Sequence, residues 1–297
     1  MTTSAPLRNE AAIATVIADV RRRLRQAGIE SADQEAVWLV EHAVGLSALQ
    51  QMVERDRVLT GAEQAALDRF VVERSQRMPL QYLLGSEEFC GLQFVVTPSV
   101  LIPRPETELL VTESLKRLAG WRRPVIVEVG TGSGCVAVTL ARALPQARIL
   151  AGDVSAAALA TAKQNGVRHG VEDRIAWLQG DLLAPLAGHG LEGQVDAIIS
   201  NPPYIAEWEW SGLQPEVRLY EPRTALVAGP RGTELHERLL VEAVPYLKPG
   251  GSLVMEVGHT QGETLRELVG TMPGYRQAEI LPDRAGIGRV LVAERVG

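Results

Sequence analysis

The chain has 297 residues, 46% of them hydrophobic and 22% charged, so it is long enough to bury the cores of two domains. A formal net charge of −6 argues against a protein that binds duplex nucleic acid, because neutralising phosphates needs a dense basic surface. Two cysteines are too few for a disulfide framework, and no Cys or His pair has the spacing of a zinc site. The chain also has no run of about 18 apolar residues that could span a membrane, and its first residues lack the apolar core of a signal peptide. We therefore expect a cytoplasmic protein without a metal site or a membrane anchor.

The first part of the chain, residues 1–85, has the patterns of a small helical domain. Within a helical pattern from residue 9 to about 77, one apolar stripe is spaced to line the first helix: Ile13, Val16, Ile17, Val20 and Leu24. Capping boxes predict three further helix starts: Ser31 with Gln34, Ser47 with Gln50, and Thr60 with Glu63. Because this stretch carries no nucleophile constellation and no glycine loop, we interpret it as a substrate-recognition domain.

Residues 86–120 have the pattern of a hairpin followed by a linker helix. Apolar residues flank Gly91 between Glu87 and Val96, which predicts a β-hairpin that bridges two domains. Two prolines then interrupt the chain before a predicted helix from about Thr107 to Leu118.

From residue 121 to 297, short apolar runs alternate with helical patterns. The strand candidates are Val125 to Val129, Arg148 to Ala151, Ile175 to Leu178, Val195 to Ser200, Ser252 to Val257, Gln277 to Leu281 and Arg289 to Ala293. Such alternation predicts an α/β domain with a parallel sheet covered by helices on both faces.

A glycine-rich segment follows the first of these strands. It reads Glu128-Val-Gly130-Thr131-Gly132-Ser133-Gly134, and bare glycine backbone there can approach a ligand at a helix N-terminus. A dinucleotide fingerprint needs G-x-G-x-x-G, but here the third glycine comes one residue early. The spacing favours an adenosyl and amino-acid ligand over a pyrophosphate.

Two aspartates follow the next strands. Asp153 ends the second strand, where its carboxylate can accept both ribose hydroxyls; the alternative is a helix N-cap, a role for which Ser155 competes. Asp181 follows the third strand and could reach an adenine amino group or could open a turn.

The tetrapeptide Asn201-Pro202-Pro203-Tyr204 directly follows the fourth strand, at the sheet edge where α/β proteins bind ligands. The two prolines restrict the backbone, so the Asn201 side-chain oxygen and the Pro202 carbonyl could accept both N–H groups of a carboxamide. Tyr204 could pack against the amide plane. An isolated Asn-Pro-Pro-Tyr is a rigid turn or a polyproline ligand, but its position behind a strand and a glycine loop favours an amide methyl-transfer site.

Together these motifs closely resemble the HemK/PrmC family, the protein-(glutamine-N5) methyltransferases that act on class I peptide chain release factors. The resemblance spans most of the chain and rests on Met78 to Gly85, Phe89, Leu101 to Glu108, Gly130 to Gly134, Asp153, Asn201 to Tyr204, Glu221-Pro222 and Glu256 to Gly258. It implies a Rossmann-like class I S-adenosylmethionine-dependent methyltransferase sheet, with a small N-terminal helical domain joined to it by the β-hairpin.

The resemblance also implies the ligands. S-adenosyl-L-methionine would be the cofactor, held by Glu128, Gly130, Thr131, Gly132, Ser133, Gly134, Asp153, Asp181, Leu182 and Asn201, with Leu182 where some relatives carry a tryptophan beside the adenine. The substrate site would comprise Asn201, Pro202, Pro203 and Tyr204, with Asn201, Pro202 and Tyr204 catalytic, around the glutamine of the Gly-Gly-Gln loop. The implied partner is a class I release factor, with no direct contact to nucleic acid or membrane, and we expect a monomer.

Other readings of the same motifs stay open. A sister family that methylates a ribosomal-protein glutamine shares the tetrapeptide but differs at Pro103 to Glu108, and DNA adenine and guanine-specific RNA enzymes also use an Asn-Pro-Pro-aromatic strand end. A non-catalytic adapter would not need an intact Asn201. The long segment Ile205 to Gly232 is expected to cover the active site or to hold the substrate, with a buried tryptophan cluster as the alternative.

Overall fold

The computed structural model describes residues 11–297, so the expectations for residues 1–10 lie outside the described part of the chain. The described chain divides into two compact units. The first comprises residues 11–85 and the segment Gln214–Tyr220, and the second comprises Ser86–Leu213 and Glu221–Gly297. Residues 86–120, which the sequence analysis set apart, belong to the second unit.

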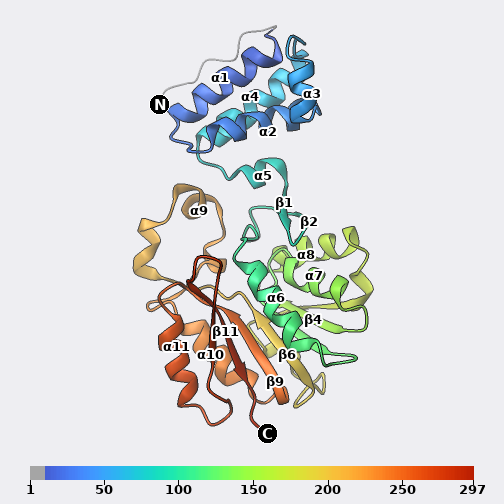
Figure 1. The fold of residues 1–297 in the computed structure, drawn as a ribbon, viewed down its shortest axis with the longest axis vertical. Coiled ribbons are helices and arrows are strands. Elements are labelled where there is room, and N and C mark those ends of the chain that lie inside the picture. The colour runs from blue at the N-terminus through green and yellow to red at the C-terminus, as the bar shows by residue number, and fades with distance from the viewer. Residues whose placement is uncertain (1–10) are drawn as a thin grey trace. The chain divides into compact units, whose positions relative to one another are not determined.

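The first unit is helical and has one apolar core (Figure 1). Its helices are α1 (Ile13–Gln26), α2 (Ala32–Val44), α3 (Ala48–Val53), α4 (Gly61–Ser75), α5 (Leu80–Leu84) and α9 (Pro215–Tyr220). The predicted stripe of α1 enters the core, because Ile13, Val16, Val20 and Leu24 are buried and Ile17 is half-buried against them. The amphipathic pattern thus placed this helix correctly.

Two of the three predicted capping boxes form. Ser47 and Thr60 each accept a hydrogen bond from the backbone three residues on, and the side chain at that position returns to the cap backbone. The prediction for Ser31 is wrong, because its hydroxyl donates to Glu35 Oε1 at 2.6 Å and caps no N–H. A capping hydroxyl accepts with a lone pair from extended backbone, whereas Ser31 has φ −84° and ψ 19°, which does not bring its oxygen to the N–H three residues on. The helix still begins at the next residue.

The second unit opens with the predicted hairpin. Strands β1 (Ser86–Phe89) and β2 (Leu92–Val95) pair antiparallel across a two-residue turn. Cys90 and Gly91 have φ values of 50° and 72° there, as a tight hairpin turn of this kind requires. Helix α6 (Thr107–Leu118) follows over the predicted range.

A seven-stranded sheet forms the centre of the second unit (Figure 1). Its strands are β3 (Val125–Val129), β4 (Arg148–Asp153), β5 (Ile175–Gln179), β6 (Val195–Ser200), β9 (Leu247–Glu256), β10 (Glu279–Pro282) and β11 (Gly288–Glu294), in the order β10-β11-β9-β6-β3-β4-β5. The longer helices among them are α7 (Cys135–Ala143), α8 (Ala156–Arg168), α10 (Glu234–Ala243) and α11 (Gly262–Gly270). Every predicted strand is present, which confirms the α/β class.

The expectation of a parallel sheet is wrong at one edge. Strand β11 runs antiparallel to both β9 and β10. Only residues 283–287 join β10 to β11, and so short a connection can return the chain only in the antiparallel direction. The remaining five strands β9, β6, β3, β4 and β5 are parallel, so their carboxyl ends meet at one edge of the sheet.

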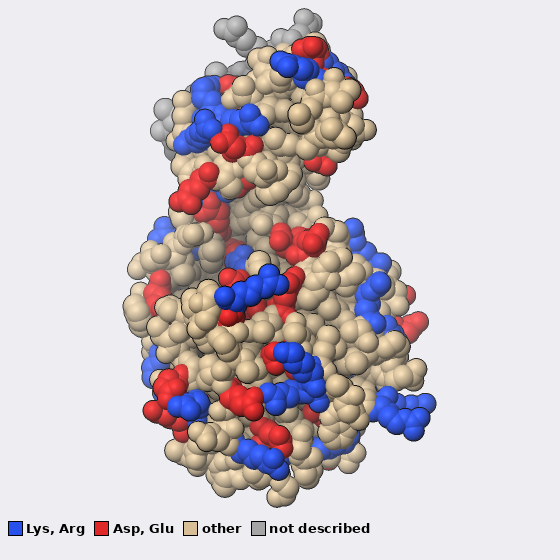
Figure 2. All heavy atoms as spheres, viewed as in Figure 1, with Lys and Arg blue, Asp and Glu red and all other residues tan. Residues whose placement is uncertain are grey.

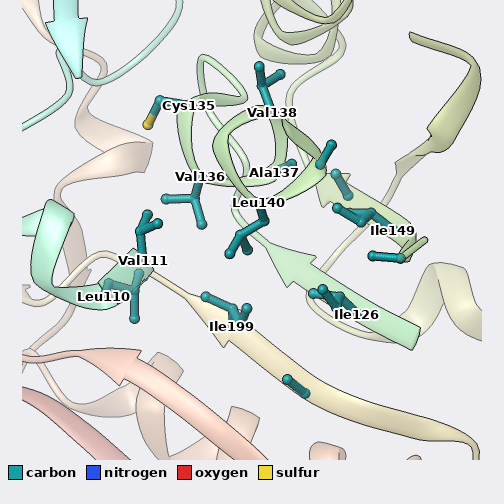
Figure 3. Close-up of a cluster of buried hydrophobic side chains, with 14 of the residues drawn as sticks. Leu110, Val111, Ile126, Cys135, Val136, Ala137, Val138, Leu140, Ile149 and Ile199 are labelled. Carbon is teal, nitrogen blue, oxygen red and sulfur yellow. The ribbon is translucent and has the colours of Figure 1, made fainter. Parts of the chain in front are cut away.

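Neighbouring side chains of the parallel strands enter two different cores. Figure 3 shows the first, where Leu110 of α6 and Leu140 of α7 pack with Ile126 and Ile199 of the sheet. The next residue along β3, Val127, joins the core on the opposite face together with side chains of α10 and α11. Burial on both faces explains why these strands are continuous apolar runs.

The long segment between β6 and α10 contains short elements that no pattern indicated. The short strands β7 (Ile205–Ala206) and β8 (Val227–Gly229) pair in parallel, and 3₁₀ helices lie at Glu207–Gly212 and Arg223–Ala225. Two further 3₁₀ helices lie earlier in the chain, at Glu172–Arg174 and Ala184–Leu186. Trp208 is 76% exposed, which contradicts a buried tryptophan cluster. Within residues 11–297, no helix combines the length and the apolar character needed to cross a membrane.

Candidate active site

A pocket lies at the carboxyl edge of the parallel strands, wholly within the second unit. The predicted site residues in its lining are Glu128, Gly130, Thr131, Gly132, Ser133, Asp153, Asp181, Leu182, Asn201, Pro202 and Pro203. Gly134 and Tyr204 do not line it. Strand β3 lies between β4 and β6, so the pocket falls where the strand order reverses, the usual ligand site of open α/β sheets.

The glycine loop follows β3 and uses left-handed backbone at three positions. Gly130, Gly132 and Gly134 have φ values of 72°, 54° and 78°. The N–H of Gly130 donates to the Gly152 carbonyl at 2.9 Å, which ties the loop to the end of β4. A Cβ at Gly134 would lie 3.0 Å from Ala162 Cβ, so glycine is needed there for the packing of α7 on α8.

The Glu128 carboxyl stabilises the glycine loop through hydrogen bonds. Its Oε2 accepts hydrogen bonds from Thr131 Oγ1 at 2.5 Å and from the Ala137 N–H at 3.1 Å. Burial raises the pKa of Glu128 to about 8, although the bonds from Thr131 and Ala137 act in the opposite direction. Glu128 therefore holds the loop against the first turn of α7 through Oε2, while the residue also lines the pocket, so its role at the cofactor stays a prediction.

Asp153 at the end of β4 also contacts the loop. Its Oδ2 accepts from the Gly132 N–H and its Oδ1 from the Ser155 N–H, both at 2.9 Å. The N-cap of α8 is Ser155, which accepts from the Ala158 N–H, so Asp153 is not the cap. Burial raises the pKa of Asp153, and the backbone hydrogen bonds to it act against that rise. A carboxylate held by two N–H groups faces the pocket.

Asp181 and Leu182 follow β5 and also line the pocket. The Asp181 carboxylate is exposed and pairs with the Arg238 guanidinium of α10 at 2.8 Å. Leu182 has a φ of 46°, and its side chain packs partly on the second sheet core. Asp181 is thus neither free nor buried, a difference from Asp153 that its position after a strand did not reveal.

Asn201 lies beside the glycine loop. A Cβ at Gly130 would come 3.9 Å from the Asn201 carbonyl oxygen, and Ser200 Oγ donates to the Val129 carbonyl at 2.8 Å. The Asn201 side chain donates from Nδ2 to Thr107 Oγ1 at 3.1 Å. Pro202 is buried and stiffens the backbone immediately after this side chain.

Tyr204 faces a different group from the one expected. Burial, and then the neighbouring Glu256 carboxyl, raise the pKa of Tyr204 to about 12. Its backbone carbonyl accepts from Gln261 Nε2 at 2.7 Å. Tyr204 is not among the residues that line the pocket, and its packing against an amide stays a prediction.

The sequence analysis left several residues around Asn201 without an individual role. Thr107 Oγ1 donates to Glu256 Oε2 at 2.7 Å, and Glu221 accepts from the Ile102 N–H at 3.1 Å and from Arg104. All lie in segments that were quoted only as parts of a resemblance. An acidic residue that ends an apolar strand, as Glu128 nearly does in β3 and Glu256 does in β9, is the signal that could have identified Glu256.

The sheet, its loop and its strand-end tetrapeptide define the chain as a class I methyltransferase. Residues 105–212 match the family described as methyltransferase small domain, and residues 15–85 match the PrmC N-terminal domain. In fold, the chain is similar to the solved hMettl16 catalytic domain in complex with MAT2A 3′UTR hairpin 1, with a TM-score of 0.57 over 82% of this chain and 84% of that one. The two are 17% identical, so the likeness concerns the fold alone.

Curated relatives identify the family. The chain is 43% identical to the release factor glutamine methyltransferase of Geobacter sulfurreducens over 93% of this chain and 94% of the relative. It is 41% identical to the protein of that name from Moorella thermoacetica over 92% and 95%, and 39% identical to that from Nitratidesulfovibrio vulgaris over 97% and 96%. The chain belongs to the release factor glutamine methyltransferase family and is an enzyme of the methyltransferase class.

Proposed function

We propose that this enzyme transfers a methyl group from S-adenosyl-L-methionine to the side-chain amide nitrogen of the glutamine in the Gly-Gly-Gln motif of class I peptide chain release factors. The name shared by the relatives supports a release factor as the substrate. Because release factors act in translation, it also supports the proposal that the enzyme works in the cytoplasm. The observation that carries the chemistry is Asn201, which lines the pocket with its backbone carbonyl beside Gly130 and its side-chain amide bound to Thr107.

The pocket fits the methyl donor. A Cβ at Gly132 would meet no protein atom within 4 Å, so bare backbone faces open space in the pocket. Gly130 to Ser133 would cradle the donor, Asp153 would accept from its ribose, and Asp181 with Leu182 would border the adenine. When bound, the donor supplies an electrophilic methyl group on a sulfonium.

The acceptor side needs positioning more than acid–base chemistry. A carboxamide nitrogen is a poor nucleophile because its lone pair is delocalised into the carbonyl. The Asn201 Oδ1 and the Pro202 carbonyl would accept its two N–H groups and hold the nitrogen toward the methyl group. Such orientation can supply about 7–11 kcal/mol in the best cases.

The first unit would help to hold the release factor. Its α3 exposes Leu49, Met52 and Val53 at 70–78%, and the unit carries no part of the pocket. Binding energy from a part of the substrate remote from the reacting atoms can be used in the transition state. A short Gly-Gly-Gln peptide should therefore be a much poorer substrate than the intact factor.

Nucleic-acid methylation is the main competing function. On the face that Figure 2 shows, basic and acidic side chains are interspersed, and the formal net charge is −6. This distribution favours a protein substrate, because a nucleic-acid cleft needs a concentration of positive charge.

Mass spectrometry of a release factor incubated with enzyme and S-adenosylmethionine tests the proposal. We expect a gain of about 14 Da confined to the Gly-Gly-Gln glutamine, and no gain when that glutamine is replaced by glutamate, which has no amide nitrogen. Parallel reactions with a Gly-Gly-Gln peptide, a ribosomal protein preparation and RNA test the alternatives. Transfer to one of these at the rate of the intact factor or faster would contradict the proposal.

A further inference from the structure

Three residues far apart in the sequence form a hydrogen-bonded relay next to the pocket. Thr107 is the first residue of α6, Asn201 follows β6, and Glu256 ends β9. Asn201 Nδ2 donates to Thr107 Oγ1 at 3.1 Å, and Thr107 Oγ1 donates to Glu256 Oε2 at 2.7 Å. Thr107 and Glu256 are only 3% and 2% exposed, so water does not substitute for these bonds.

The chemistry of the three groups gives this relay one direction. An ionised carboxylate has no proton and can only accept, so Glu256 takes the single hydroxyl proton of Thr107. The Thr107 oxygen then presents only lone pairs to Asn201. Of the two ends of the Asn201 amide, only the NH₂ can bond to a lone pair, which turns Oδ1 away from Thr107.

We propose that Thr107 and Glu256 are positioning residues that hold the Asn201 carboxamide with its oxygen available to the acceptor amide. The inference rests on the proposed function and deepens it. A glutamine side chain approaches with two N–H donors, so it needs acceptors. If the Asn201 amide were reversed, its NH₂ would meet the NH₂ of the substrate, and the two donors would repel each other.

The groups around Glu256 determine when the relay is intact. Burial raises the pKa of Glu256 to about 7. The hydrogen bonds from Thr107 and Tyr204 and the charge of Arg289 on β11 lower it, whereas the charge of Glu106 raises it. Tyr204 is neutral at this pH, and His236 of α10 contacts only the Glu256 backbone carbonyl, at 2.9 Å. Burial lowers the pKa of His236, so its ring stays uncharged near neutral pH.

Protonation of Glu256 would reverse the relay. A protonated carboxyl can donate to Thr107 Oγ1, which frees the hydroxyl proton to bond to Asn201 Oδ1 instead. The population with Asn201 correctly oriented should therefore fall as the pH drops below about 7.

Matched hydroxyl variants on α6 test the relay. Thr107→Val keeps the shape of the side chain and removes both bonds, and Thr107→Ser restores the hydroxyl. Ser114→Ala is the control, because Ser114 is also fully buried on α6 but donates to its own helix at Leu110. For each variant we would measure single-turnover rates on the intact release factor, S-adenosylmethionine affinity by titration calorimetry and the thermal midpoint.

We expect Thr107→Val to lower the single-turnover rate about 100-fold, the usual effect of losing one oriented hydrogen-bonding group at a reacting centre. Thr107→Ser should recover most of it, Ser114→Ala should match the wild type, and the affinity for S-adenosylmethionine should change less than about threefold in all three. The wild-type rate should fall below pH 7, and that inflection should be absent from Thr107→Val and from Glu256→Gln.

A double substitution separates positioning from a general structural effect. Thr107→Val added to Asn201→Ala should slow the reaction no further, since the relay acts only through Asn201. A Thr107→Val enzyme with near-normal rate and an unchanged pH profile would overturn the relay while leaving the proposed function intact. Absence of transfer by the wild-type enzyme to the release factor would overturn both.

Discussion

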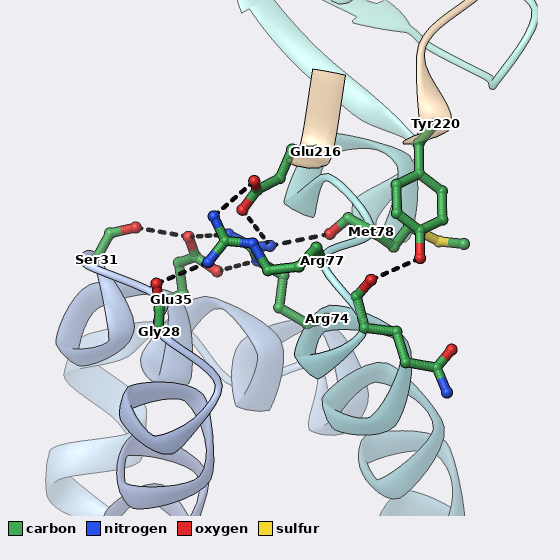
Figure 4. Close-up of polar contacts among 9 residues, drawn as sticks. Gly28, Ser31, Glu35, Arg74, Arg77, Met78, Glu216 and Tyr220 are labelled. Atoms are coloured by element: carbon green, nitrogen blue, oxygen red, sulfur yellow. Dashed lines mark hydrogen bonds and ion pairs between the residues drawn. The ribbon is translucent and has the colours of Figure 1, made fainter. Parts of the chain in front are cut away.

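Both units contain glutamate side chains that are buried or half-buried, but the two units bind these carboxyls with different partners. In the first unit, Glu35 and Glu216 are held by Arg74 and Arg77 (Figure 4). In the second unit, Glu128 and Glu256 are held by hydroxyl and backbone N–H donors, and neither forms an ion pair within residues 11–297.

The arginine-bound cluster has a structural purpose. Arg74 reaches Glu35 at 2.6 Å and Glu216 at 3.1 Å, and Arg77 reaches Glu216 at 2.7 Å and the Gly28 carbonyl at 2.7 Å. Burial alone would raise the pKa of Glu216, but bonds from its own backbone and from the two arginines keep it below the usual value. The ion pairs from Arg74 and Arg77 to Glu216 hold α9 on the first unit.

The carboxyls of the catalytic unit have a different character. Burial without an ion pair raises the pKa of Glu128 to about 8 and that of Glu256 to about 7, so both carboxyls change charge near neutral pH. A buried carboxyl bound by arginine thus stabilises a fold, whereas one bound by hydroxyls can orient neighbouring groups and respond to pH.

The largest expected effect tests the chemical side of this comparison. Asn201→Ala should lower the single-turnover rate by about 1000-fold, because the acceptor amide loses its oriented partner. Binding of S-adenosylmethionine should weaken far less, and the thermal midpoint should change little. Single-turnover assays at saturating cofactor measure the first quantity and calorimetry the second. A variant with near-normal turnover would refute the proposed acceptor site.

Breaking the ion cluster should affect the stability of the first unit. Glu35→Gln leaves the buried Arg74 with only one carboxylate, and we expect it to lower local stability by about 3 kcal/mol. Hydrogen exchange of the α2 and α4 amides reports this value without assuming that the whole chain unfolds in one step.

An exposed ion pair between Asp33, which lies on α2 like Glu35, and Arg25 of α1 supplies the control. Asp33 lies 2.6 Å from Arg25, the same separation as Glu35 and Arg74, but both partners are more than 60% exposed. Asp33→Asn should change the stability by about 0–1 kcal/mol. Equal losses for Asp33→Asn and Glu35→Gln would show that burial is not what distinguishes the cluster.

Asp153→Ala should weaken S-adenosylmethionine binding by about 30-fold or more, equivalent to about 2 kcal/mol. The variant loses a charged acceptor for the ribose and also the two bonds that order Gly132 and Ser155. Asp181→Ala is the matched comparison, since that exposed carboxylate already pairs with Arg238; its loss should cost less than about tenfold. Unchanged affinity in Asp153→Ala would limit Asp153 to organising the loop.

The smallest effect concerns the pH dependence of stability. A folded-state pKa of about 8 for Glu128 lies above the ordinary glutamate value of 4.5. Its protonated form therefore stabilises the fold fully below about pH 4.5, and this contribution is lost as the pH rises through 8. The side chain of Glu128→Gln cannot ionise. Between pH 6 and pH 8, the free energy of unfolding of this variant should therefore fall by about 1–2 kcal/mol less than that of the wild type. Denaturant titrations at the two pH values measure this difference, and parallel curves would contradict the assigned pKa.

The sequence by itself determined the features that depend on neighbouring residues. Apolar spacing located α1, a capping box located α4, and two prolines marked the start of α6. The apolar residues around Gly91 located the hairpin, and the apolar runs located every strand of the sheet. The order of the glycine loop, Asp153 and Asn201 was also enough to predict that these residues line one pocket. The carboxyl ends of parallel strands share one edge of the sheet, whatever path the chain takes between the strands.

Only the tertiary structure decided which distant groups meet. Asp181 paired with Arg238, and α9 joined the first unit through Glu216, because each carboxylate met an arginine that lies far from it in the sequence. Thr107, Asn201 and Glu256 come together only when α6, β6 and β9 pack. The one-dimensional pattern records which side chains are polar and which strand they end, but the direction of a hydrogen bond depends on the partner that folding brings within about 3 Å.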